Sequence, residues 1–243
     1  MSLEVVISPT RQELGKTAAA AVAASLRTRN APFSIFFAAA PSQNETLDAL
    51  AATPGLPWDL ATACHLDEYI GLAEDAPQSF RRYLLDRIVG PAGIPRFHGL
   101  RGEAPDIKAE IARYSAILEA QYPTIGCIGI GENGHIAFND PPYAKFDDLS
   151  LVRYAELTRE CREQQVHDQT FPDLPSVPTH ALTLSIHALM RVPELFVMVP
   201  GIRKAEAVKK TLKGEIREAC PASILRMHPK ATLFLDADSA SLL

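Results

Sequence analysis

The hydrophobic residues of this chain follow two alternating patterns, short apolar runs and longer stretches with helical spacing. The apolar runs predict strands over residues 3–8, 33–38, 60–66, 125–130, 149–157, 181–186, 195–199 and 232–236. The helical spacing predicts helices over residues 10–26, 43–52, 79–89, 106–121 and 204–213. Strands and helices in this order indicate an α/β fold in three layers (α/β/α), with an open, mostly parallel, modified Rossmann-like sheet.

Composition narrows the class of protein without changing this picture. The 243 residues are 47% hydrophobic and contain no internal repeat or long linker, so we expect a single domain over residues 1–243. The formal charge of −5 argues against a nucleic-acid partner. No apolar run approaches the ~18 residues that cross a membrane, and residues 1–4 do not resemble the start of a signal peptide.

The four cysteines are widely spaced and form no CxxC pair, which fits neither a disulfide scaffold nor a zinc ribbon. We expect buried, reduced thiols at Cys64, Cys127, Cys161 and Cys220. Together with the preceding features, this predicts a cytoplasmic protein with no membrane partner and no metal.

Two segments imitate nucleotide-binding motifs. Gly15-Lys16-Thr17 resembles the end of a P-loop, but Thr10 stands where that motif needs glycine, and the triplet lies inside a helical pattern. The segment 129–134 fits GxGxxG after a strand, but Pro141 and Pro142 prevent the long helix that a dinucleotide site requires. We therefore expect no nucleotide cofactor.

Ligands of open α/β sheets bind beyond the carboxyl ends of the strands, which directs attention to the loops 39–45, 66–72 and 129–142. In the third loop, the glycines allow backbone N–H groups to converge on an anionic ligand. His135 and Asp140 follow at a spacing suited to proton transfer. The alternative is a histidine with a purely structural role and an aspartate that caps a turn.

Three further positions carry candidate chemistry. Of the neighbours Asp67 and Glu68, only one faces a given pocket if the segment is extended, and the sequence leaves open which one. Ser42 is placed to bind a phosphate at a helix N-terminus, or else to cap that helix in the pattern Ser-x-x-Glu. Lys204 is placed to bind the same phosphate, or else is an exposed helix lysine.

Two long segments then point to a family. Asp67-Glu68-Tyr69-Ile70-Gly71-Leu72 and Gly129-Ile130-Gly131-Glu132-Asn133-Gly134-His135-Ile136-Ala137-Phe138-Asn139-Asp140-Pro141 closely resemble the two signatures of the glucosamine-6-phosphate deaminase/isomerase family. Weaker similarity at residues 104–107, 181–183, 201–205 and 228–231 extends the resemblance over most of the chain. The related 6-phosphogluconolactonases share the fold but differ on both flanks of the glycine-rich loop.

The resemblance implies conversion of an amino-sugar 6-phosphate, glucosamine 6-phosphate before others, to fructose 6-phosphate and ammonia. It implies that Asp67 moves a proton between C2 and C1 and that His135 opens the sugar ring, with Asp140 and Asn133 beside it. The positions that resemble substrate-binding ones are Ser42, Gln43, Gly134 and Lys204. The implied partner is a small-molecule sugar phosphate, without cofactor or metal, and the protein is expected to be a monomer or a small homo-oligomer.

Three departures from the family pattern keep alternatives open. Asn133 stands where some members have aspartate, and Ala39-Ala40-Pro41-Ser42 replaces a segment like Gly-Gly-Thr-Pro. An expected phosphate-binding arginine falls near His167 and Asp168, with Arg162 the nearest arginine upstream. The alternatives are a 6-phosphogluconolactonase-type hydrolase and a sugar-phosphate sensor without activity. Any lid is expected within residues 142–178, the least regular stretch.

Overall fold

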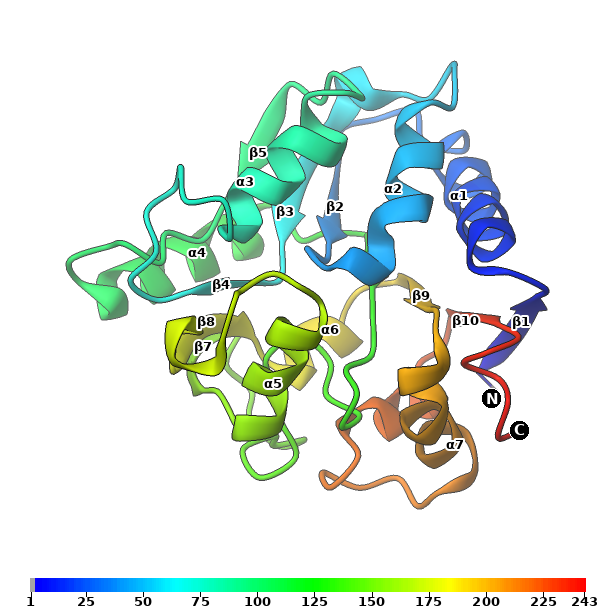
Figure 1. Ribbon diagram of the computed structural model, residues 1–243. Helices are drawn as coiled ribbons and strands as arrows, with labels where there is room; N and C mark the ends of the chain where they lie inside the picture. The colour runs from blue at the N-terminus through cyan, green and yellow to red at the C-terminus, as the bar shows by residue number, and fades with distance from the viewer. Residues whose placement is uncertain (1–2) are drawn as a thin grey trace.

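The computed structural model describes residues 3–243, so Met1 and Ser2, part of the segment expected not to begin a signal peptide, lie outside the described residues. A seven-stranded sheet forms its centre, with all neighbouring strands parallel (Figure 1). Across the sheet the order is β1 (Glu4–Ser8), β10 (Ala231–Asp236), β9 (Glu194–Val199), β6 (Ile125–Ile128), β2 (Phe33–Phe37), β3 (Ala61–His65) and β5 (Arg96–His98).

Helices cover both faces of this sheet, because its central strands are apolar on both sides. Phe37 belongs to a core with α1 (Arg11–Leu26), α2 (Asn44–Ala51) and α3 (Phe80–Leu84), which continues as a π-helical turn over Leu85–Val89. The neighbouring Phe36 belongs to a second core, with α4 (Ile107–Ala120), α6 (Ile186–Met190) and α7 (Ala205–Lys213). The predicted three-layer α/β/α class is confirmed.

A smaller antiparallel sheet was not predicted. Its order is β4 (Asp67–Tyr69), β8 (His180–Leu184) and β7 (Val152–Glu156). Sequence reasoning placed the last two in one mostly parallel sheet, which is wrong, because the chain pairs again after β3 ends. The N–H of Leu184 donates to the carbonyl of Leu66, and Asp67 then opens β4. Asp67 therefore sits in a short strand and not in a free loop.

The helix α5 (Arg159–His167) was also missed, and it lies against the smaller sheet, across the molecule from α1 (Figure 1). Its sequence is almost entirely polar, so it carries no apolar periodicity. Its start is nevertheless defined, since the side chain of Thr158 accepts a hydrogen bond from the N–H of Cys161. Over residues 3–243 no helix combines the length and apolar character that crossing a membrane requires.

Candidate active site

A pocket lies at the carboxyl ends of β2, β6 and β9, closed on one side by β4 and α5. Four of its residues follow β2, a second group belongs to the loop after β6, and a third comes from α5. The lining residues are Ala38, Ala39, Ala40, Ser42, Leu66, Asp67, Phe80, Gly129, Ile130, Gly131, His135, Ala137, Phe138, Gln164, Gln165, Asp168 and Lys204. The structure thus brings Asp67, His135, Ser42 and Lys204 to one cavity, at the sheet edge where the sequence placed them.

The question of which acidic neighbour faces the pocket is answered by the pairing of β4. Asp67 lines the cavity with 8% of its surface exposed. Glu68 points the other way, where its carboxylate accepts hydrogen bonds from the Ser79 hydroxyl and from the N–H groups of Phe80 and Arg81. Burial, and secondarily the charge of Glu68, raise the pKa of Asp67 well above its ordinary value. An ionised Asp67 is therefore a stronger base than an exposed carboxylate.

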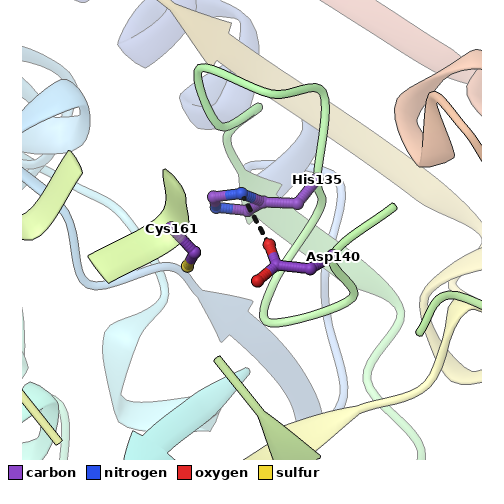
Figure 2. A group of neighbouring side chains, drawn as sticks. All are labelled: His135, Asp140 and Cys161. Carbon is purple, nitrogen blue, oxygen red and sulfur yellow. Dashed lines mark ion pairs between the residues drawn. The ribbon is translucent and has the colours of Figure 1, made fainter. Parts of the chain in front are cut away.

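His135 is held by two oxygen atoms on one side of its ring. Its Nδ1 lies 2.7 Å from Oδ1 of Asn133. The same nitrogen lies 3.2 Å from Oδ1 of Asp140 (Figure 2). Both atoms are acceptors in this geometry, so Nδ1 carries the proton and Nε2 is left with a lone pair. The histidine lines the pocket, which favours the proton-transfer interpretation over the purely structural one.

Asp140 is fully buried behind the histidine. Its second oxygen accepts hydrogen bonds from the backbone N–H and the hydroxyl of Thr158, at 2.9 and 2.8 Å. Burial alone raises a carboxyl pKa, but the contacts with His135 and Thr158 outweigh it and bring the pKa of Asp140 to about 2. The carboxylate is therefore ionised throughout the neutral range and fixes the tautomer of His135.

Four backbone N–H groups in the segment 129–135 are hydrogen-bonded within the protein. The N–H of Gly131 donates to the carbonyl of His135, and the N–H of Gly134 donates to the carbonyl of Gly131. The N–H groups of Glu132 and His135 donate to the side chains of Gln164 and Asn133. These four groups are occupied inside the protein and are not free to bind an anionic ligand.

Two glycines of this loop are required by the geometry of the backbone and of its surroundings. Gly134 does not line the pocket and adopts φ +89°, a turn conformation that disfavours side chains, so its predicted contact with substrate is not supported. At Gly131 the reason is space, because a Cβ there would overlap the imidazole of His135. The ring of His135 packs on the bare backbone of Gly131.

Ser42 and Gln43 follow β2, and Ser42 lines the pocket. The hydroxyl of Ser42 accepts a hydrogen bond from Nε2 of Gln43 at 3.1 Å. The helix α2 begins without a side-chain cap, so the capping interpretation of Ser42 is wrong. Gln43 is fully buried, does not line the pocket, and also donates to the carbonyl of Met198 at 3.3 Å. It supports Ser42 from behind.

Lys204 ends a short 3-10 turn before α7 and lines the same pocket. It is only 7% exposed, which rules out the exposed-lysine interpretation. Burial lowers the pKa of Lys204, while the negative charges of Asp168 and Glu132 act in the opposite direction.

Sequence reasoning missed three pocket residues, Gln164, Gln165 and Asp168, because the polar helix α5 was not recognised. Gln165 accepts a hydrogen bond from the hydroxyl of Tyr69, and Gln164 donates to Asp168. The helical N-cap at Thr158 was the one signal that could have revealed them.

The expected phosphate-binding arginine is absent from the pocket. Arg162 donates to the carbonyls of Leu174 and Val177 and so anchors the proline-rich loop, while Asp168 lines the cavity. Among the described lining residues, Lys204 is the one lysine or arginine.

Comparison with known proteins gives the family. The model of the family "Glucosamine-6-phosphate isomerases/6-phosphogluconolactonase" matches residues 9–234. A glucosamine-6-phosphate deaminase of Listeria innocua is 39% identical over 202 residues, which are 83% of this chain and 84% of the relative. One of Exiguobacterium is 38% identical over 180 residues, 74% of this chain and 69% of the relative.

Solved structures agree with this match. A monomeric glucosamine-6-phosphate deaminase superposes with a TM-score of 0.91 at 32% identity, covering 99% of this chain and 100% of its own. A 6-phosphogluconolactonase from Trypanosoma brucei superposes with a TM-score of 0.80 at 17% identity, covering 99% and 98%, which is a likeness of fold alone. The resemblance found in the sequence motifs is confirmed, and the chain belongs to the family of glucosamine-6-phosphate isomerases and 6-phosphogluconolactonases.

Proposed function

We propose that this protein is a glucosamine-6-phosphate deaminase, which converts glucosamine 6-phosphate and water to fructose 6-phosphate and ammonia. One observation carries the proposal: a buried carboxylate, Asp67, faces the same pocket as the hydrogen-bonded pair His135–Asp140. Removal of a proton from carbon and opening of the sugar ring need two separate proton-transfer groups, and the pocket offers both. The relatives that carry the name of this activity support the same choice.

The phosphate is assigned to the end of the pocket that holds Ser42 and Lys204. The ammonium of Lys204 supplies positive charge, and the hydroxyl of Ser42 donates a hydrogen bond while its oxygen is held by Gln43. Binding there directs the sugar toward the other end of the pocket.

His135 opens the ring. Because Nδ1 carries the proton, Nε2 accepts the proton of the C1 hydroxyl and returns it to the ring oxygen as the C1–O bond to that oxygen breaks. Asp140 stabilises the imidazolium that exists between the two transfers. The product of this step is the open-chain aldehyde.

Asp67 then moves the proton of C2 to C1. Removal of the C2 proton, with transfer of one proton from the C2 ammonium to O1, gives an enolamine. Return of the C2 proton to C1 leaves an iminium at C2, which water converts to the ketone with loss of ammonia. The buried position of Asp67 strengthens it as a base. This carboxylate has no counterpart in a simple lactone hydrolysis, where a water molecule needs only one base.

The test is to incubate purified protein with glucosamine 6-phosphate and to measure ammonia and fructose 6-phosphate in parallel. Equal amounts of both are expected, and neither is expected from an Asp67→Asn variant. Hydrolysis of 6-phosphogluconolactone in place of deamination would establish the lactonase alternative. Tight binding of the sugar phosphate without any product would establish the sensor.

We further propose that one chain suffices for activity and that the protein works in a reducing cytoplasm. A monomeric glucosamine-6-phosphate deaminase superposes on 99% of this chain, and the four cysteines, all buried, form no disulfide. Light scattering and activity across a dilution series test the first point. A specific activity that falls in step with dissociation of an oligomer would contradict it.

A further inference from the structure

His135 and two side chains behind it carry metal-binding atoms that face one another. One ring nitrogen of His135, a carboxylate oxygen of Asp140 and Sγ of Cys161 all lie within 4.8 Å of one another, and Nδ1 is the ring nitrogen that contacts Asp140 (Figure 2). The three side chains are buried, and within residues 3–243 they form the one such group of three. The proposed reaction uses the histidine and the aspartate but leaves the thiol without a task.

The chemistry of this group selects one kind of ion. Imidazole nitrogen, carboxylate oxygen and thiolate sulfur are the ligands of Zn²⁺, whereas Mg²⁺ and Ca²⁺ bind oxygen. Zinc bonds of about 2.0–2.3 Å in a tetrahedron place two ligand atoms roughly 3.3–3.8 Å apart. The distance from Nδ1 to Oδ1 of Asp140 is 3.2 Å, and Sγ of Cys161 lies within 4.8 Å of a ring nitrogen and of the carboxylate.

Thr158 positions two of the three ligands, Asp140 and Cys161. The hydroxyl of Thr158 donates to Asp140 and accepts from the N–H of Cys161, so one residue fixes both the aspartate and the start of the helix that carries the cysteine. Oδ1 of Asn133 lies 2.7 Å from Nδ1. This oxygen is available as the fourth ligand. A closed zinc site needs four donors in this arrangement.

We propose that His135, Asp140 and Cys161 form a binding site for Zn²⁺, and that the metal inhibits the enzyme through it. Zinc forms bonds to Nδ1, to the carboxylate oxygen and to the sulfur. The Nδ1 proton is replaced by a proton on Nε2, and the thiol proton leaves to solvent. With Nε2 protonated and Nδ1 bound to metal, His135 no longer accepts a proton from the sugar.

Binding is tested directly on chelator-treated protein. Cobalt(II) serves as the spectroscopic probe, and Zn²⁺ is titrated against a chromophoric chelator. We expect a thiolate-to-cobalt absorption band in the wild type and in the control Cys127→Ala, whose thiol is equally buried on β6. Cys161→Ala should lack the band and bind Zn²⁺ at least about tenfold more weakly. The near-isosteric Cys161→Ser serves as the second variant if alanine disturbs folding.

Inhibition is tested separately, and this part rests on the proposed function. Without metal, both Cys161 variants should deaminate glucosamine 6-phosphate at the wild-type rate, and each should need at least about tenfold more Zn²⁺ for half inhibition. Absence of the cobalt band in the wild type, or equal zinc affinity in wild type and both Cys161 variants, overturns the site. Zinc binding that leaves deamination unchanged overturns the inhibition. If no variant deaminates, the proposed function fails while the titration still decides the metal site.

Discussion

The end of the pocket assigned to proton transfer and the end assigned to the phosphate differ in how completely their polar groups are paired. At one end, Nδ1 of His135 contacts Asn133 and Asp140, and Asp140 in turn accepts two hydrogen bonds from Thr158. At the other end, Lys204 forms no ion pair within the described residues. Groups that transfer protons are thus fixed in advance, whereas the groups assigned to the phosphate keep their donors for the ligand.

This contrast predicts that variants at the first end lower kcat and that variants at the second end raise KM. The largest effect is expected for Asp67→Asn. Loss of the base should reduce kcat by about 10²–10⁴-fold and abolish exchange of the C2 proton with solvent, while substrate affinity changes little. The measurements are steady-state kinetics and deuterium incorporation into the product. Exchange that persists in the variant would remove Asp67 from its assigned role.

His135→Gln should also lower kcat by about 10²–10⁴-fold, because ring opening loses its acid and base. The loss should become smaller as a larger fraction of the substrate is supplied in the open-chain form, since the later steps do not use the histidine. Rapid-mixing kinetics with freshly dissolved ring-closed substrate would measure it. Wild-type rates under those conditions would exclude His135 from ring opening.

At the other end of the pocket, Lys204→Ala should raise KM by about ten- to hundredfold with little change in kcat, since a charged hydrogen bond to phosphate is lost in ground and transition states alike. Lys209→Ala on α7 is the matched control, because it removes the same charge from an exposed position outside the pocket. A defect confined to kcat in Lys204→Ala would contradict the assignment.

The pairing of Asp140 should also be visible in stability. Its pKa is about 2, below the ordinary value of 3.8, so the folded state binds its proton less tightly than the unfolded state. The ionised group then contributes roughly 2 kcal/mol above the unfolded pKa, and this contribution disappears as the pH falls from about 4 to about 2. Denaturant unfolding of wild type and Asp140→Asn from neutral to acid pH measures it. A stability difference that stays constant over that range would refute the linkage.

The smallest effect is expected for Ser42→Ala, which removes one neutral hydroxyl from the phosphate end. KM should rise about two- to tenfold, the range of a single uncharged hydrogen bond. The comparison between the two ends becomes sharper if the Ser42 and Lys204 changes both leave kcat intact. A fall in kcat larger than the rise in KM would instead place Ser42 among the groups that stabilise the transition state.

The central sheet was predictable because its strands are apolar on both faces, as Phe36 and Phe37 show by packing in opposite cores. The strand β5, three residues long, and the polar helix α5 carry no such pattern. Their positions are set by contacts with parts of the chain that are distant in sequence. For α5, one such contact is the hydrogen bond from the hydroxyl of Tyr69 to Gln165.

The site was predictable to the same degree. Motifs located Asp67, His135 and Asp140, but the orientation of Asp67 against Glu68 depends on the pairing of β4 with β8, which no local pattern encodes. The positions of Gln164, Gln165 and Asp168 could be known only from the fold. These residues belong to α5 or directly follow it, about thirty residues beyond the loop 129–135 in the chain.

The contact between Gly131 and the ring of His135 has a consequence for how this protein tolerates change. The imidazole occupies the space that any side chain at position 131 would need. In a saturation mutagenesis experiment scored by activity, position 131 should therefore be as intolerant as the histidine itself, although it contributes no reactive atom. A chemically silent residue would carry the same genetic signature as a catalytic one.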